Sequence, residues 1–205
     1  MQVSIIDYNM GNLESVNKAL SKININSIVT NNQEDIANSD IILLPGVGAY
    51  KAGMEHLHEL NLVDFLNNQV MVKKKPYLGI CLGMQLISSF GNEPVKTQGL
   101  GWIEGEVVKI NFDKLRVPHI GWNEISIKQE DYYPKNLESK DFYFIHSYHF
   151  KPEDPSCISS TVNYGEEIVA GVKKDNIFAM QFHPEKSQNS GLNLLRNYFK
   201  KHVKN

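Results

Sequence analysis

Short apolar runs alternate with amphipathic stretches along the first half of the chain. Four of these runs predict strands, at residues 3–7, 27–30, 40–45 and 76–80, and the first of them is expected to be buried. Between the first two, apolar residues recur at helical spacing from Leu13 to Ile23, behind Asn12, a residue type that caps helices. Two further helical stretches follow Gly48. Because strands and helices alternate, we expect a parallel sheet with helices on both faces.

The pattern changes near residue 100, where short strands follow one another closely. We predict them at residues 102–110, 124–128, 142–150, 158–163, 168–173 and 177–181. They are expected to form an antiparallel extension and the far edge of the main sheet, and a last helix is predicted over 191–202. The fold class is α/β. With 205 residues, no repeat and no linker-like segment, residues 1–205 are expected to form one domain.

Composition narrows the function classes. Lysine and arginine number 21 against 23 acidic residues, a formal net charge of −2, so binding of nucleic acid or an anionic membrane surface is not expected to be the main activity. No apolar run approaches the length of about 18 residues that a membrane helix needs. The first residues lack the basic and long apolar regions of a secretory signal, and we expect a cytoplasmic protein whose two cysteines, Cys81 and Cys157, are thiols.

Cys81 stands where the fourth apolar run gives way to a helical pattern over 84–90. Gly79 and Gly83 flank it two positions away on either side, which is the spacing of a nucleophile elbow with cysteine in place of serine. A sharp turn there lifts the side chain above the sheet, and a following helix N-terminus favours the thiolate. A generic free cysteine is more often a small core residue. The two glycines favour a reactive nucleophile.

A cysteine nucleophile needs a base, and His183 is the best placed of the seven histidines. Pro184 forces extended backbone at His183, and residues two apart in extended chain project to the same side, so Glu185 can reach the imidazole. That carboxylate would fix the ring tautomer and stabilise the imidazolium. A lone His-x-Glu is usually a surface pair. Together with the elbow, it predicts a Cys81, His183 and Glu185 triad.

The loop after the third strand carries Pro45, Gly46, Val47 and Gly48. Backbone N–H groups of Val47 and Gly48, with that of Leu82, could hold an oxyanion next to the nucleophile. A glycine-bearing loop can also cradle a phosphate. The glycine spacing fits neither a dinucleotide-binding fingerprint nor a P-loop, so nucleotide binding is weakly supported.

Residues 79–85, with sequence GICLGMQ, and 182–187, with sequence FHPEKS, resemble the motifs of class I, or triad, glutamine amidotransferases. The resemblance implies a Rossmann-like, mostly parallel sheet with helices on both faces. More narrowly, five segments resemble the glutaminase subunits of imidazole glycerol phosphate synthases, at residues 7–12, 45–48, 99–101, 118–123 and 144–148. The resemblance implies that glutamine is hydrolysed through a Cys81 thioester, and that ammonia passes to a (β/α)8 barrel cyclase bound as a heterodimer partner.

The same resemblance assigns further residues. It places glutamine against Gln85, Glu93, Ser147 and Tyr148, and it places the synthase partner against Asn12, Trp122, Tyr143 and Lys186. Ordinary roles are the alternative for the second set, such as a helix cap for Asn12. Residues 88–98 look shorter than the family pattern, which affects the assignment of Glu93.

Neither a cofactor nor a metal ion is expected. His146 and His149, three apart in one predicted strand, would project to opposite faces, and no cluster of other ligands completes a metal site. Two alternatives to the leading function stay open. The same glutaminase chemistry could feed a synthase that amidates surface-polysaccharide sugars, or the chain could be a free-standing cysteine hydrolase.

Overall fold

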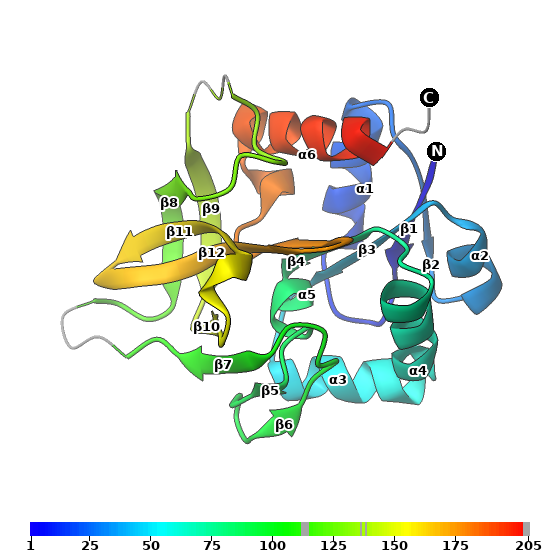
Figure 1. Ribbon diagram of the computed structural model, residues 1–205, viewed down its shortest axis with the longest axis horizontal. Helices are drawn as coiled ribbons and strands as arrows, with labels where there is room; N and C mark the ends of the chain where they lie inside the picture. The colour runs from blue at the N-terminus through cyan, green and yellow to red at the C-terminus, as the bar shows by residue number, and fades with distance from the viewer. Residues whose placement is uncertain (112–114, 136, 138, 203–205) are drawn as a thin grey trace.

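The computed structural model describes residues 1–111, 115–135, 137 and 139–202 (Figure 1). A nine-stranded sheet runs through the molecule in the order β2-β1-β3-β4-β13-β12-β11-β8-β9. Its first five strands are parallel, and they are β2 (Asn26–Thr30), β1 (Gln2–Ile6), β3 (Ile41–Gly46), β4 (Tyr77–Cys81) and β13 (Ile177–Met180). The other four pair antiparallel, and they are β12 (Glu166–Lys174), β11 (Ile158–Tyr164), β8 (His119–Ile127) and β9 (Asp141–His146). The α/β prediction with an antiparallel extension is confirmed.

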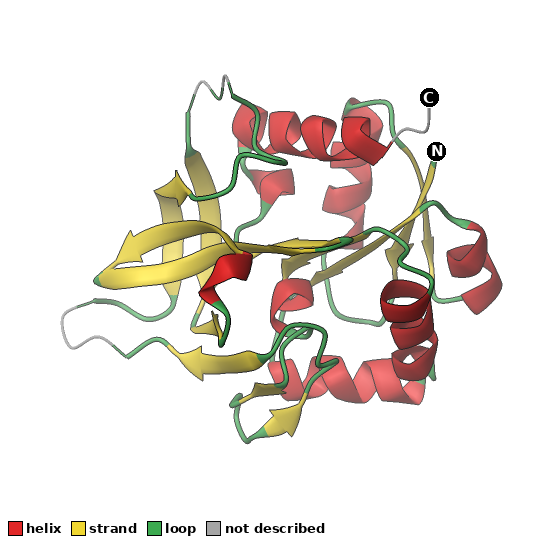
Figure 2. Cartoon of the chain, in the orientation of Figure 1, coloured by secondary structure: helices red, strands yellow, loops and turns green. Residues whose placement is uncertain are grey.

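Helices cover both faces of the parallel part, as expected (Figure 2). They are α1 (Leu13–Lys22), α2 (Gln33–Asn38), α3 (Tyr50–Glu59), α4 (Leu62–Asn67), the π-helical turn Asn68–Val72, α5 (Leu82–Gln85) and α6 (Gln188–His202). Alternate residues of β3 face opposite sides: Ile41 and Leu43 pack with α1 and α6, whereas Ile42 and Leu44 pack with α3 and α4. In the described part of the chain, no helix is both long and apolar enough to cross a membrane.

A second, four-stranded sheet lies beside the first and was not predicted. It consists of β10 (Tyr148–Pro152), β7 (Gly105–Lys109), β5 (Phe90–Gly91) and β6 (Thr97–Gln98). The prediction of one strand over 142–150 is therefore wrong. The strand is interrupted at Ser147, where the chain passes from β9 in the large sheet to β10 in the small one. The Ser147 carbonyl accepts a hydrogen bond from the amide of Ile110, 2.9 Å away. This crossing sets Ser147 and Tyr148 at the boundary between the sheets.

Two helical segments also differ from the prediction. The α2 helix was missed, although Asn32 caps it by accepting hydrogen bonds from the amides of Glu34 and Asp35. The helix predicted over 84–90 is only the short α5, because the carbonyls of Leu86 and Ile87 accept hydrogen bonds from residues 100–103 instead of continuing a helix.

Candidate active site

Cys81 ends β4 at a sharp turn. Its backbone has φ +53° and ψ −107°, a conformation that a side chain rarely adopts without strain. A Cβ added to Gly83 would collide with the carbonyl oxygen of Leu44, and one on Gly79 would lie 2.9 Å from the Cβ of Ala179. Both flanking glycines are thus required by close packing. The turn has the strand-to-helix geometry that presents a nucleophile.

His183 follows β13, the strand that pairs with β4, so it reaches the same edge of the sheet as Cys81. Its Nδ1 donates to Oε1 of Glu185 at 2.7 Å, and both side chains are only 3% exposed. The amide of His183 donates to the carbonyl of Tyr143, and its own carbonyl accepts from the hydroxyl of Ser187, so β9 holds the histidine in place. The structure thus places His183 in contact with Glu185, and close enough to Cys81 for the sulfur to influence the pKa of the imidazole.

The charge state of His183 depends on its neighbours. Burial alone favours the neutral ring, but the negative charges of Cys81 and Glu185 outweigh it and raise the pKa of His183 to about 10. Its second nitrogen, Nε2, is buried and finds no hydrogen-bond partner among the described residues. An imidazolium held by Glu185 beside a cysteine is an arrangement that can assist nucleophilic attack by sulfur.

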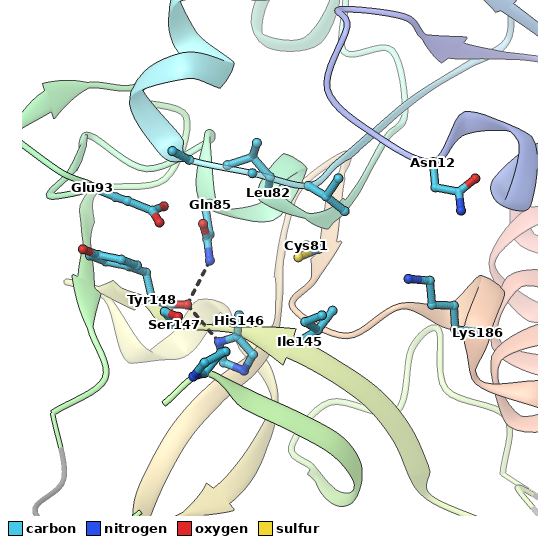
Figure 3. A pocket seen from close by; sticks show the side chains of 14 residues that line it. Asn12, Cys81, Leu82, Gln85, Glu93, Ile145, His146, Ser147, Tyr148 and Lys186 are labelled. Atoms are coloured by element: carbon cyan, nitrogen blue, oxygen red, sulfur yellow. Dashed lines mark hydrogen bonds between the residues drawn. The ribbon is translucent and has the colours of Figure 1, made fainter. Parts of the chain in front are cut away.

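A cleft of about 600 Å³ opens in front of Cys81, with more than enough room for an amino acid (Figure 3). Fourteen residues line it: Asn12, Val47, Gly48, Ala49, Cys81, Leu82, Gln85, Glu93, Pro118, Ile145, His146, Ser147, Tyr148 and Lys186. The predicted oxyanion residues Val47, Gly48 and Leu82 are all among them. His183 and Glu185 are not, and their side chains are almost completely buried.

The four residues predicted to contact glutamine line one end of this cleft (Figure 3). Gln85 donates from Nε2 to the carbonyl of Tyr148 at 2.9 Å. Glu93 accepts the amide of Tyr50 at 3.1 Å, at the start of α3, and burial raises the pKa of its carboxyl. The shorter stretch before residue 98 still brings Glu93 to the cleft.

The four predicted partner contacts fall into two groups. Asn12 caps α1 through the amide of Ser15, and together with Lys186 it lines the end of the cleft away from Glu93 (Figure 3). Trp122 and Tyr143 lie outside the cleft as a cross-strand pair of β8 and β9, and the Lys186 ammonium sits 5.7 Å from the Tyr143 ring.

An apolar surface surrounds that pair. Ile120 and Ile145 also oppose each other across β8 and β9, and they are 56% and 37% exposed, while Trp122 is 44% exposed. We call Ile120, Trp122, Tyr143 and Ile145 the docking face. Since Ile145 also lines the cleft, this face is continuous with the site.

Sequence reasoning missed a histidine pair in the cleft wall. The expectation that His146 and His149 share a strand is wrong, because β9 ends at His146. Instead, His146 Nε2 lies 2.9 Å from His119 Nδ1, and His146 Nδ1 lies 2.8 Å from the Tyr148 carbonyl. A carbonyl only accepts, so each ring carries its proton on Nδ1, and Asn123 donates to His119 Nε2. Burial lowers the pKa of His146 to about 3 and that of His119 to about 4, so both rings are neutral.

Gln181 is the second missed residue. It follows β13 two positions before His183 and is fully buried between Cys81 and Gln85. Its position next to the histidine motif could have indicated a residue of the site. Nothing in the neighbouring sequence indicated that it contacts Cys81 and Gln85.

The second cysteine has a different environment. Cys157 is buried, its sulfur donates to the carbonyl of Asp154 at 3.1 Å, and burial raises its pKa to about 11. These features are those of an unreactive thiol.

Known proteins resemble the chain over nearly its full length. A family model described as glutamine amidotransferase class-I matches residues 4–202. The protein named imidazole glycerol phosphate synthase subunit HisH 1 of Campylobacter jejuni subsp. jejuni serotype O:23/36 (strain 81-176) is 49% identical over 198 residues, 96% of this chain and 98% of that protein. The subunit HisH of Aquifex aeolicus (strain VF5) is 44% identical, over 98% of this chain and 97% of that protein.

Solved structures share the fold at low sequence identity. A crystal structure of a glutamine amidotransferase superposes with a TM-score of 0.76 at 18% identity, covering 98% of this chain and 97% of that chain. The structure of PurLQS from Thermotoga maritima gives 0.73 at 14% identity, with 98% of each chain covered. The family match and the full-length relatives together establish that this chain belongs to the class I glutamine amidotransferases.

Proposed function

We propose that this protein is the glutaminase subunit of an imidazole glycerol phosphate synthase. It hydrolyses glutamine to glutamate and passes the ammonia to a synthase subunit in histidine biosynthesis. The observation that carries the proposal is the position of Cys81. It lies at a strained turn beside an imidazole that Glu185 holds at 2.7 Å, and it lines a cleft with room for an amino acid. Full-length similarity to proteins of that name supports the choice of synthase.

In the first half of the reaction the Cys81 sulfur attacks the side-chain amide carbon of glutamine. The carbonyl electrons move to oxygen, and the backbone N–H groups at Val47, Gly48 and Leu82 are proposed to stabilise that oxyanion. His183 gives its proton to the amide nitrogen as the C–N bond breaks, which releases ammonia and leaves a γ-glutamyl thioester.

Water completes the cycle. His183, now neutral, takes a proton from water, whose oxygen attacks the thioester carbon. The C–S bond then breaks and glutamate leaves as the Cys81 thiolate and the imidazolium are restored. Gln85, Glu93, Ser147 and Tyr148 are proposed to hold the glutamine backbone and side chain during both steps.

A partner subunit has a chemical reason to cover the site. Ammonia that escapes into neutral water is protonated and loses its nucleophilicity. The docking face beside the cleft, with Asn12 and Lys186 at its rim, supports a seal between this subunit and a (β/α)8 barrel cyclase. We also infer that residues 1–205 act as one domain, and that the protein works in the cytoplasm, where its unpaired thiols stay reduced.

The test uses the chain with and without the cyclase. Glutamate release should be slow alone and should rise sharply when the cyclase and its ligand are added. Cys81→Ala should abolish glutamine-dependent synthesis, while the complex still works with ammonium salts. High turnover without a partner would favour a free-standing hydrolase, and acceleration only by a sugar-amidating synthase would reassign the acceptor.

A further inference from the structure

Gln181 is a fully buried polar side chain that touches both the nucleophile and a residue of the substrate cleft. Its Nε2 lies 3.6 Å from the sulfur of Cys81, and its Oε1 lies 3.0 Å from Nε2 of Gln85. The backbone amide of Gln181 donates to the carbonyl of Ala170 in β12, so the residue is anchored in the large sheet. A buried amide with both ends engaged has little freedom to turn.

The direction of these contacts follows from one fixed acceptor. The Tyr148 carbonyl can only accept, so the amide group of Gln85 that faces it must be the NH2 (Figure 3). The second N–H of that group then points at Gln181, whose oxygen must be the atom that receives it. The NH2 of Gln181 is thereby turned toward Cys81, and the sulfur accepts a hydrogen bond.

We propose that Gln181 is a positioning residue for the glutaminase reaction, which fixes the Cys81 sulfur and the Gln85 amide relative to each other. This inference rests on the proposed function in taking Cys81 as the nucleophile. An N–H that points at sulfur stabilises the thiolate more than the thiol. Because Gln181 occupies one N–H of Gln85 and Tyr148 the other, the carbonyl oxygen of Gln85 is the atom left to meet a ligand.

The test measures the sulfur directly, without glutamine or a partner. Iodoacetamide forms an S–C bond with a thiolate as iodide leaves, and peptide mapping follows Cys81 and the buried Cys157 separately. In Gln181→Met, which keeps length but has no donor, alkylation of Cys81 at pH 7 should slow about tenfold, the lower end expected for losing a hydrogen bond to a charged group. The matched control is Gln98→Met, a substitution of an exposed glutamine outside the cleft. Cys81 in this variant should react at the wild-type rate.

A second pair of variants removes the effect of an unpaired Gln85. Gln85→Met removes the donor that orients Gln181, but a thiolate can only accept, so the NH2 of Gln181 is still expected to face the sulfur. Gln85→Met with Gln181→Met loses this contact and leaves neither amide orphaned. The double variant should again be alkylated about tenfold more slowly than the single variant. In glutaminase assays with the cyclase, Gln181→Met should lower kcat for glutamine by a similar factor and also raise KM, because Gln85 loses an acceptor.

Equal alkylation rates within the pair that shares Gln85→Met would overturn the inference, even if Gln181→Met alone is slow or fails to fold. Slower alkylation in both comparisons, with Cys157 unreactive throughout, supports it. Absence of glutaminase activity in the wild-type complex would count against the proposed function. The alkylation result would still test the contact between Gln181 and the Cys81 sulfur, because it needs neither glutamine nor a partner.

Discussion

At the scale of single residues, the site depends on the charge of Glu185. The carboxylate accepts a hydrogen bond from Nδ1–H of His183, so that Nε2 is the nitrogen available to the sulfur. In Glu185→Gln the shape is kept but the charge is lost, and the amide can donate to Nδ1 and select the wrong tautomer. We expect kcat to fall by about 10²–10⁴-fold with little change in KM, as measured by glutamate release in the complex.

The control for this prediction is Glu167→Gln, which removes a carboxylate from an exposed pair with Lys128. It should leave glutamate release unchanged. If Glu185→Gln kept more than half of the wild-type kcat, the carboxylate would not be orienting the base.

Gly48 is a second position where we expect a single added carbon, a Cβ, to affect activity. Its φ is +110°, and a Cβ there would lie 2.8 Å from the Cε of Met10. Gly101→Ala is a matched control, since its φ is +69° but a Cβ would meet nothing within 4 Å. Both substitutions should destabilise the fold by about 1–2 kcal/mol through the backbone. Only Gly48→Ala should also reduce kcat, because it displaces the proposed oxyanion loop. Equal activity in the two variants would argue against that role of the loop.

The residues that could be predicted are those with local signals. Gly79 and Gly83 around Cys81, and Pro184 between His183 and Glu185, specify backbone geometry within a few positions. Gln181 could not be assigned, because its two partners come from the end of β4 and from α5, about a hundred residues earlier in the chain. The pairing of His119 with His146 likewise depends on the register of two strands.

At the scale of elements, β8 and β9 carry the docking face, which we propose to contact the cyclase. Ile120→Lys places a charge at its most exposed apolar residue, and desolvating that charge against a partner is costly. We expect the affinity for the cyclase to fall about tenfold or more, measured by titration of the stimulated glutaminase activity. Val72→Lys, at an apolar residue that is 71% exposed on the π-helical turn, should bind the cyclase normally. Similar affinities for both variants would place the partner elsewhere.

The strand pattern predicted the elements of the parallel half more accurately than those of the second half. Parallel strands are short apolar runs with helices between them, and each was recognised from that pattern. Among these five strands, the edge strand β2 is the one that is largely exposed. The change of sheet at Ser147 had no local signal, since residues 142–150 keep a strand-like composition throughout. The break depends on the distant amide of Ile110, and it is this break that brings Ser147 and Tyr148 to the cleft.

At the scale of the whole molecule, the neutral histidine pair predicts a loss of stability in acid. The pKa of His146 is lowered to about 3 in the folded state, so its contribution to stability is complete above the unfolded value of about 6.5. As the pH falls from there toward 3, the ring is protonated in the unfolded chain but not in the folded one. The free energy of unfolding therefore falls by about 1.4 kcal/mol per pH unit for this ring. His119, whose pKa is lowered to about 4, adds to the same trend.

His146→Gln tests this prediction, because the amide can still donate to Tyr148 and accept from His119 but does not titrate. Urea unfolding between pH 7 and pH 4 should show a shallower loss of stability than in the wild type. His58→Gln, at an exposed position, controls for removal of a histidine from the surface. An identical slope for the wild type and His146→Gln would exclude His146 as a source of the acid sensitivity.

The most direct measurement is to trap the covalent intermediate. The complex is quenched in acid while it turns over glutamine. It is then digested, and the peptide masses are measured by mass spectrometry. We predict a γ-glutamyl group on the Cys81 peptide, absent when Cys81→Ala is used and absent from Cys157. An adduct on another residue, or steady glutamate release by Cys81→Ala, would contradict the assignment of this sulfur as the nucleophile.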